Sequence, residues 1–341
     1  MILSPFSRLY GVFSDLRNTL YEKGVFKSFS LGAKTISVGN ITFGGTGKTP
    51  FVAFVAEVLA DSGEKVCILS RGYGRENAKQ RVLVSDGKTI FADAKTGGDE
   101  PLELANKLLG KAIVIADADR VAAANWVREK FEITAFVLDD AFQHRRAKRD
   151  FDIVLLDATK PFEILREPLK NLERADLIVI TRANLIENIS NLKSKISNYT
   201  DAPIFIAENK ISNLVRLEEF PAKAQSTQSK PQHLPPTTYH YFAFCALGNP
   251  ENFFEQLRRE NFNLVASEKF ADHHFYTQKD IENLEAKAKE TGADILITTA
   301  KDAVKLKALK SSLPCFVAES RMIFDDENAL REIIKSSEFQ F

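Results

Sequence analysis

Apolar residues along the chain fall into short runs separated by segments with helical periodicity. Runs rich in Ile, Val and Leu predict strands at 34–38, 65–69, 112–116, 133–138, 151–156 and 177–181, with 203–207 as a candidate last strand. Continuous apolar runs are typical of strands buried on both faces of a parallel sheet. A helix is predicted at 50–61, with Pro50 in its first turn and Gly63 just past its end. This alternation predicts a doubly wound, mainly parallel α/β domain over residues 31–220.

The pattern stops at residues 221–239, which are rich in Pro, Gln, Ser and Thr and carry little apolar material. We interpret this segment as a linker. A second alternation follows, with strands expected at 241–246, 264–268, 294–298 and 315–318, and with helices expected to begin near Asn249, Thr277 and Lys301. It predicts a second, smaller α/β domain over residues 240–341.

The N-terminal region, residues 1–30, contains a predicted amphipathic helix at 5–22. Its apolar positions recur mostly at spacings of three or four, so they lie on one face of the helix. These positions are Phe6, Leu9, Tyr10, Phe13, Leu16 and Leu20. Arg17, Lys23 and Lys27 add positive charge nearby. Two interpretations stay open: the helix packs on the protein's own core, or it lies in a membrane interface with its basic groups near lipid phosphates.

Composition argues against several classes of partner and of binding site. Lys+Arg and Asp+Glu both number 46, so the formal net charge is zero and the basic excess of nucleic-acid binders is absent. The three cysteines, Cys67, Cys245 and Cys315, are far apart, which fits a reducing compartment and argues against disulfides or a zinc site. The sequence shows neither a signal peptide nor an apolar run near the ~20 residues that cross a bilayer. We expect a cytoplasmic protein with no nucleic-acid partner and no evident obligate protein partner.

A glycine-rich segment at 37–50, SVGNITFGGTGKTP, lies between the first predicted strand and the first predicted helix. That context predicts a P-loop, in which backbone N–H groups and the helix N-terminus bind the phosphates of ATP. Lys48 is expected to reach the β- and γ-phosphates, and the Thr49 hydroxyl is expected to bind Mg²⁺. Thr42 departs from the pattern, because it stands where the first Gly is usual. The predicted ATP-binding residues are Thr42, Phe43, Gly44, Gly45, Thr46, Gly47, Lys48 and Thr49.

The predicted strand at 133–138 runs into Asp139 and Asp140. An apolar strand that ends in acid, in a chain with a P-loop, is typical of the Walker B arrangement, whose carboxylate holds Mg²⁺ directly or through water. Gln143 and His144 follow in the basic segment FQHRR. That segment is either a solvated face or, beside a phosphate site, a contact for substrate.

Two further segments carry acid–base residues. In TGGDEP at 96–101, two glycines precede paired carboxylates, and Asp99 is a candidate base for a kinase that must take the proton of an alcohol. Taken alone, Asp99 is better interpreted as a helix cap. In FADHHFY at 270–276, two of the five histidines stand beside an Asp, and an imidazole near a carboxylate can share a proton near neutral pH. A metal site is disfavoured there because adjacent residues rarely share a metal and no Cys/His cluster completes the ligand set; a plain polar loop stays open.

In this order, the segments resemble the tetraacyldisaccharide 4′-kinase family of lipid A biosynthesis. The matching segments are SVGNITFGGTGKTP at 37–50, LSRGYGR at 69–75, GDEP at 98–101, DDAFQHRR at 139–146, LREP at 165–168, ADHH at 271–274 and TTAKDAVKL at 298–306. LYEKGVFKS at 20–28 is similar to the family's N-terminal segment. The ordered set spans most of the chain and is far more specific than any one segment.

The resemblance implies a P-loop NTPase-like core, a second α/β domain, and an active site in the cleft between them. It implies transfer of the γ-phosphate of ATP, with Mg²⁺, to the 4′-hydroxyl of tetraacyldisaccharide 1-phosphate, which gives lipid IVA. It also implies that the N-terminal helix lies on the cytoplasmic face of the bacterial inner membrane, so that the protein is peripheral there.

Roles for individual residues follow from the same resemblance. Asp99 matches the family's base and His273 its partner. Asp139 and Asp140 match the Walker B pair, and Glu167 matches an acid associated with the metal site. Candidate substrate contacts are Glu100, Arg120, Gln143 and His144.

The chain departs from the family pattern in three places. Ala141 replaces a Gly, Ala300 replaces a Glu, and residues 161–168 form a shorter segment than the family's loop before LREP. The shortening admits a third interpretation besides kinase and scaffold, an inactive lipid-binding remnant. A P-loop ATPase or GTPase that acts as a membrane-associated scaffold or regulator is the alternative function. A GTPase would need an Asp where Ser212 stands, and a partitioning-type ATPase would need a Lys where Phe43 stands.

Overall fold

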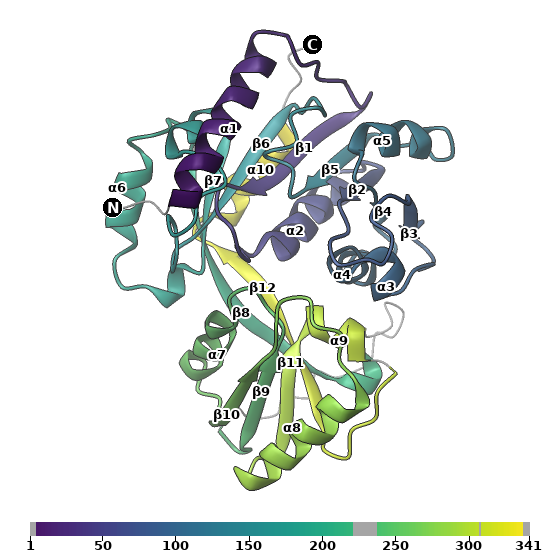
Figure 1. Cartoon of the computed structure of the whole chain (residues 1–341), viewed down its shortest axis with the longest axis vertical. Helices are drawn as coiled ribbons and strands as arrows, with labels where there is room; N and C mark the ends of the chain where they lie inside the picture. Colours follow the sequence, from purple (N-terminus) through teal and green to yellow (C-terminus); the bar gives the residue numbers. More distant parts are fainter. Residues whose placement is uncertain (1–4, 221–236, 307, 337–341) are drawn as a thin grey trace.

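The computed structural model describes residues 5–220, 237–306 and 308–336. A larger α/β unit and a smaller one are joined by two long strands (Figure 1). The linker predicted at 221–239 lies outside the described residues except for its last three positions.

A single sheet of twelve strands runs through both units, in the order β10-β9-β11-β12-β8-β7-β6-β1-β5-β2-β4-β3. The larger unit holds β1 (Lys34–Asn40), β2 (Val66–Ser70), β3 (Val82–Ser85), β4 (Ala112–Ala116), β5 (Ala135–Asp139), β6 (Phe151–Asp157) and β7 (Leu177–Thr181). All of these pair in parallel except β3, which is antiparallel to β4 at the edge. The predicted doubly wound, mainly parallel sheet is therefore confirmed, and only the short edge strand β3 was not expected.

Helices cover both faces of this sheet because successive strand residues point to opposite sides. Val66 and Ile68 of β2 share a core with α2 (Lys48–Asp61) and α4 (Asp99–Lys107). Cys67 and Leu69 pack instead in a core that includes α5 (Arg120–Arg128). The helices α3 (Ala94–Gly97) and α6 (Ile189–Ile196) also belong to the larger unit.

The smaller unit repeats the alternation on a lesser scale. Parallel strands β9 (Tyr241–Cys245), β10 (Leu264–Lys269) and β11 (Ile295–Thr299) are joined by β12 (Cys315–Phe324), and the helices are α7 (Pro250–Arg259), α8 (Gln278–Glu290) and α9 (Ala300–Leu306). These helices begin within one residue of the predicted starts.

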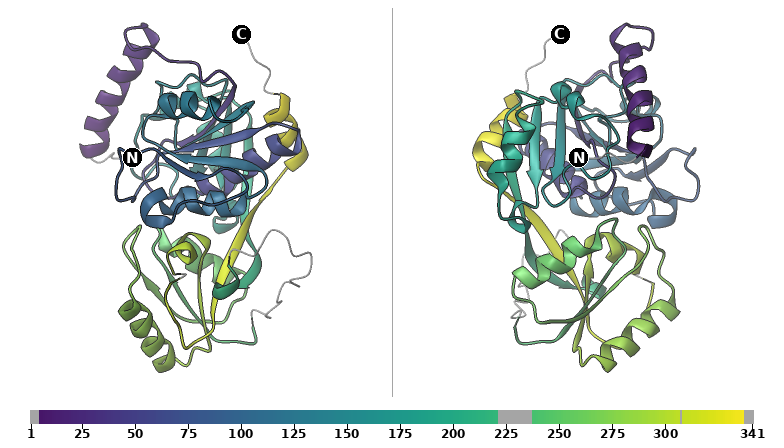
Figure 2. Two further views of the ribbon diagram at one scale, coloured as in Figure 1. Left: turned by 90° about the vertical axis from the view of Figure 1, so that its right-hand side faces the viewer. Right: turned by 60° about the vertical axis from the view of Figure 1, so that its left-hand side comes forward.

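The two units are connected differently from the expectation. Strand β8 (Ile204–Arg216) continues well past residue 207 and pairs with β12 as a long antiparallel ribbon. After β12 the chain returns to the larger unit as α10 (Glu327–Ser336) (Figure 2). Leu330 and Ile334 of α10 are fully buried in the core that contains α2. The expectation that residues 240–341 all belong to the smaller unit is therefore corrected at its C-terminal end.

Helix α1 (Pro5–Glu22) lies on the flank of the larger unit, away from α10 (Figure 2). The helix predicted at 5–22 is present, but its described second half attaches through polar groups, with Ser14 and Asn18 buried and Leu16 58% exposed. Among the helices that the structure describes, none is long and apolar enough to span a membrane.

Candidate active site

A cleft of about 930 Å³ opens between the two units. The larger unit contributes the P-loop, Glu100 at the start of α4 and Asp140 just after β5. The smaller unit contributes Asp272, His273 and Lys301 from the opposite side. The cleft thus lies at the carboxyl ends of β1 and β5, where open α/β sheets bind their ligands.

The P-loop follows β1 directly and has the curled backbone that its glycines predict. Gly44 and Gly47 adopt φ values of 101° and 79°, which residues other than Gly rarely adopt. Thr42 pairs with Leu165 in an isolated bridge, and the Phe43 N–H donates to the Ile164 carbonyl at 2.8 Å. The loop's first residues are therefore fixed by the segment that carries LREP.

Two adjacent residues that belong to no sequence motif hold the rest of the P-loop. The Thr181 hydroxyl donates to the Thr46 carbonyl at 2.9 Å, and Arg182 donates to the Gly45 carbonyl at 2.7 Å. Arg182 is also paired with Asp157, whose carboxylate accepts a hydrogen bond of 3.1 Å from Asn252 on α7. The P-loop is thereby connected to the smaller unit, a link between distant segments that no local pattern could reveal.

Asp139, the last residue of β5, has a buried carboxylate whose negative charge has few stabilising partners. Ser70 donates a hydrogen bond of 2.7 Å to it. Burial, together with the negative charges of Glu100 and Asp140, raises the pKa of Asp139 to about 7. A site with this excess of negative charge suits a cation.

Asp140 is held ionised by two cations. Its carboxylate lies 3.3 Å from Nζ of Lys48 and 2.9 Å from Arg166. Burial opposes ionisation, but these charges and hydrogen bonds lower the pKa of Asp140 to about 2. The structure therefore places the predicted P-loop lysine and the predicted Walker B acids at one point, and it adds Arg166, which sequence reasoning did not single out.

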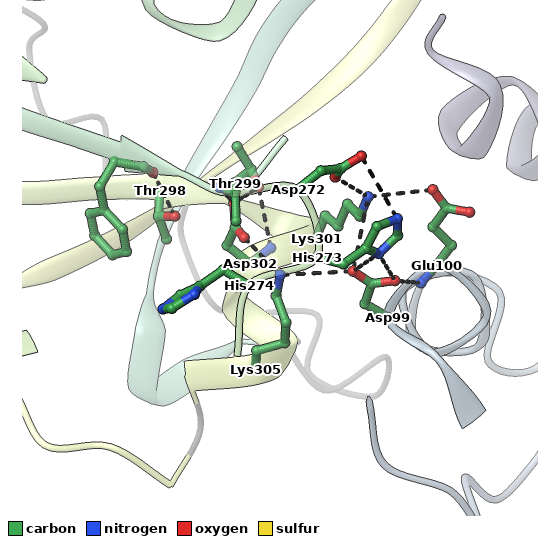
Figure 3. A network of polar contacts seen from close by, with 12 residues as sticks. Asp99, Glu100, Asp272, His273, His274, Thr298, Thr299, Lys301, Asp302 and Lys305 are labelled. Carbon is green, nitrogen blue, oxygen red and sulfur yellow. Dashed lines mark hydrogen bonds and ion pairs between the residues drawn. The ribbon is translucent and has the colours of Figure 1, made fainter. Parts of the chain in front are cut away.

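Asp99 and His273 meet across the cleft although 174 residues separate them (Figure 3). Nδ1 of His273 lies 2.9 Å from Oδ2 and 3.1 Å from Oδ1 of Asp99. Burial disfavours the Asp99 carboxylate, but the hydrogen bond from His273 and nearby lysines hold the pKa of Asp99 below its usual value. The same hydrogen bond raises the pKa of His273.

His274 points away from this pair (Figure 3). Its ring stacks on Phe270 at 4.9 Å, and Nε2 lies 3.2 Å from Asp280. The two adjacent histidines therefore have different surroundings, one in the cleft and one in the packing of the smaller unit.

Lysines of α9 complete the cluster around Asp99, although the sequence analysis gave them no role. Lys301 lies 3.4 Å from Glu100, 3.3 Å from Asp272 and 3.9 Å from Asp99. Lys305 lies 3.7 Å from Asp99. The segment TTAKDAVKL at 298–306 could have indicated this role, because its two lysines are four residues apart and share a helix face.

Glu167 does not line the cleft; its carboxylate belongs to another cluster. Asn18 donates to it at 3.1 Å, Asn171 at 2.8 Å and Arg174 at 2.5 Å, while Arg17 lies 3.8 Å away. The side chain is fully buried and attaches α1 to the larger unit. This arrangement departs from the metal-site role implied by the resemblance, because the carboxylate is already occupied by protein donors.

The remaining substrate candidates lie at the cleft but also support its walls. Arg120 is buried and donates to the Asp139 carbonyl at 3.1 Å. Gln143 donates to the Asn40 carbonyl at 2.8 Å. Burial and the neighbouring arginines lower the pKa of His144 to about 4, so its imidazole is neutral near pH 7. Arg120 and Gln143 therefore stabilise the backbone of the cleft wall, in addition to any contact with a substrate.

Within the described parts of the chain, no group of three or more His, Cys, Asp or Glu side chains is arranged to hold a metal. An ion here would thus need ligands of other kinds as well. The Thr49 hydroxyl and the phosphates of a nucleotide are such ligands, and they fit the excess negative charge around Asp139.

Comparisons with known proteins agree with this geometry. The family described as tetraacyldisaccharide-1-P 4′-kinase matches residues 1–338. Proteins named tetraacyldisaccharide 4′-kinase are similar to the chain: one from Chlorobaculum parvum is 37% identical over 82% of this chain and 77% of its own, and one from Desulfotalea psychrophila is 36% identical over 93% and 91%. The crystal structure of LpxK from Aquifex aeolicus in complex with ATP matches at 31% identity and a TM-score of 0.75, covering 98% of each chain. The chain therefore belongs to the tetraacyldisaccharide-1-P 4′-kinase family.

Proposed function

We propose that this protein transfers the γ-phosphate of ATP to the 4′-hydroxyl of tetraacyldisaccharide 1-phosphate, giving lipid IVA. The observation that carries the proposal is the Asp99–His273 pair, which faces a P-loop across one cleft. A scaffold ATPase needs the P-loop but has no use for a carboxylate of the P-loop unit that is paired with an imidazole from a second unit. Family membership supports the same choice.

The P-loop residues 42–49 are proposed to bind the phosphates of ATP. Backbone N–H groups of the loop and the N-terminus of α2 provide positive potential. Lys48 lies 3.3 Å from the carboxylate of Asp140, which supports a role for its ammonium in neutralising the charge of the nucleotide. Arg166 pairs with the same carboxylate and can keep it occupied when Lys48 turns to the phosphates.

Magnesium is proposed to bind through the Thr49 hydroxyl and the carboxylates of Asp139 and Asp140. When bound, it would neutralise charge on the transferring phosphoryl group. We leave Glu167 out of this ligand set because its carboxylate is held by Asn18, Asn171 and Arg174. Asp139 is the stronger candidate, because its carboxylate is buried beside the negative charges of Glu100 and Asp140, which together raise its pKa.

The acceptor hydroxyl is proposed to donate its hydrogen bond to Asp99. His273 orients the carboxylate, and Asp99 takes the proton as the new O–P bond forms. Because phosphoryl transfer proceeds through a loose transition state, orientation of the alcohol matters more than early removal of its proton. A carboxylate with a low pKa is therefore adequate for this role. Glu100, Arg120, Gln143 and His144 stay candidate contacts for the sugar or its 1-phosphate.

A membrane-facing role for the N-terminal region, which comprises α1 and the segment after it, completes the proposal. The lipid substrate carries four acyl chains, and the described surface after α1 exposes Val25, Phe26 and Phe29 at 62%, 44% and 44%. Such side chains can enter the boundary between headgroups and acyl chains. We place the protein peripherally on the cytoplasmic face of the inner membrane.

The direct test is incubation of the purified protein with ATP, Mg²⁺ and tetraacyldisaccharide 1-phosphate in mixed micelles, followed by mass measurement of the lipid. Gain of one phosphate is expected, and the 4′ position can be assigned by fragmentation. Lys48→Ala should abolish most turnover, whereas Lys79→Ala, an exposed lysine on another loop, should not change it. ATP hydrolysis without any phosphorylated lipid would favour the scaffold ATPase instead.

A further inference from the structure

We propose that Lys305 is a positioning residue for phosphoryl transfer: its buried ammonium, carried by the smaller unit, holds and orients the carboxylate of Asp99. The inference rests on the proposed function and deepens it, because that function requires an oriented base but does not say what besides His273 orients it.

The geometry places Lys305 behind the catalytic pair (Figure 3). Nζ of Lys305 lies 3.7 Å from Oδ2 of Asp99 and 3.0 Å from Oδ1 of Asp302. The side chains of Lys305 and Asp302 are both 0% exposed, and that of Asp99 is 4% exposed. An ammonium sealed from water in this way interacts more strongly with nearby carboxylates than one at the surface does.

Asp302 fixes the ammonium independently of Asp99. Its Oδ2 accepts hydrogen bonds from the Ala246 N–H at 3.1 Å and from the Thr299 hydroxyl at 2.8 Å, which leaves Oδ1 facing Lys305. The Tyr276 ring lies 5.5 Å from the same ammonium. The position of Lys305 is thus determined inside the smaller unit, and Asp99 meets a preformed cation.

Lys301 has a different place in the same cluster. Its side chain lines the cleft, is 13% exposed, and is shared among Glu100, Asp272 and Asp99. Within the described chain, the ion pairs of Lys305 are with Asp99 and Asp302 alone, and its ammonium forms no hydrogen bond of good geometry. Lys301 therefore neutralises the rim of the cleft, while Lys305 has Asp99 as its one partner across the interface.

The expected consequence is an Asp99 carboxylate that stays ionised and fixed while the sugar hydroxyl approaches. The proton of that hydroxyl moves to Asp99 as its oxygen bonds to the γ-phosphorus and the bond to the ADP oxygen breaks. The charged groups facing Asp99 are the cations His273, Lys301 and Lys305 from the smaller unit, the anion Asp272 beside them, and Glu100 and Glu103 on its own helix.

The experiment compares Lys305→Met with the control Lys279→Met, which removes an exposed lysine of the smaller unit. For Lys305→Met we expect kcat to fall on the order of 10-fold, with the KM for ATP nearly unchanged, because base orientation is used in the chemical step. The acidic limb of the kcat profile should move up by about 1 pH unit, since Asp99 loses one of its cations. Lys279→Met should match the wild type in all three measurements.

A double variant keeps the test decisive if Lys305→Met folds poorly. Lys305→Met/Asp302→Asn removes the ammonium without leaving Asp302 as an unpaired buried charge, and the Asn oxygen can still accept from Ala246. The same loss of kcat and the same pH shift in the double variant support the proposal. Recovery of the wild-type kcat and profile would mean that Lys305 merely neutralises Asp302, and the proposal would be wrong.

A readout that needs no turnover separates this inference from the proposed function. The pKa of His273 can be followed by NMR of its ring protons, assigned with His273→Asn. In Lys305→Met it should rise relative to Lys279→Met, because a positive neighbour of the pair is gone. An unchanged His273 pKa would overturn the role of Lys305 even in an active enzyme, whereas a shifted pKa in a protein without kinase activity would overturn the function alone.

Discussion

The side-chain amide of Asn18 donates a 3.1 Å hydrogen bond to the carboxylate of Glu167, and this contact joins the N-terminal helix to the larger unit. Glu167 is fully buried, and Arg174 and Asn171 bind the same carboxylate. The next residue along the chain, Arg166, pairs with Asp140 at the P-loop. One short segment, residues 165–168, therefore connects α1 with the nucleotide site.

Glu167→Gln should destabilise the protein rather than weaken its metal site. The change leaves Arg174 without its charged partner at a buried position, a loss on the order of 3 kcal/mol in the free energy of unfolding. Thermal unfolding and hydrogen exchange over α1 measure the effect, and exchange should rise in residues 14–22. Glu163→Gln is the control, because Glu163 is exposed and forms its ion pair with Lys160, which is exposed as well. A variant of normal stability that needs far more Mg²⁺ would instead restore the metal-ligand role.

The membrane role of the N-terminal region can be tested without deleting the helix. Leu16, Val25 and Phe26 are exposed by 58%, 62% and 44%, so changing all three to Ser should leave folding intact. Burial of one such side chain is worth about 1.5–3 kcal/mol, so binding to anionic vesicles should fall at least ~10-fold if these side chains enter the interface. Co-sedimentation measures the loss. Phe91→Ser, which removes an aromatic ring that is 57% exposed elsewhere, should bind like the wild type; equal binding by all three proteins would exclude these residues as the anchor.

The sequence predicted most of what depends on local pattern. Buried strands such as 112–116 and 177–181 were located to the residue because they are apolar on both faces. The ribbon was missed because β8 and β12 are only partly buried beyond residues 207 and 318. These stretches need no apolar run, and they contain Glu208, Lys210, Glu319 and Arg321. Helix α10 was assigned to the smaller unit because no local sequence pattern indicates that the chain returns to the larger unit after β12.

The candidate site divides in the same way. The P-loop, Asp139 and Asp140 are contiguous motifs, and sequence alone placed them beside one another. The pairing of Asp99 with His273 came from resemblance to a family, because no local rule joins residues 174 positions apart. Arg182, Asn252 and Lys305 act through contacts between elements. The contact of Glu167 with Asn18 is of the same kind, because its partner helix lies in a distant part of the chain.

The stability of the docked arrangement should depend on pH through Asp99 and His273. The pKa of Asp99 is depressed, so its contribution is present above its unfolded value of about 3.9 and is lost as pH falls through the folded value. The pKa of His273 is raised, so its contribution is complete below about 6.5 and is lost as pH rises through the folded value. Both contributions coexist between about pH 4 and 6.5.

The difference in melting temperature between wild type and His273→Asn should be largest in that window and shrink toward pH 9. Asn is chosen because His273 has a φ of 62°. A difference independent of pH would mean that the ion pair does not stabilise docking.

The kinetic test of the same pair asks whether Asp99 and His273 act as one unit. Each of Asp99→Ala and His273→Asn should lower kcat by roughly 10²–10⁴-fold, with smaller effects on the KM for ATP, because acid–base assistance acts in the chemical step. If His273 works only by holding Asp99, which it approaches to 2.9 Å, the double variant should be little worse than the poorer single variant. Multiplicative losses would mean that His273 contacts the substrate separately. His274→Ala is the internal control: its ring stacks on Phe270 and faces Asp280, so its loss should cost stability but little kcat. A severe kcat defect at His274 with none at His273 would reverse the assignment.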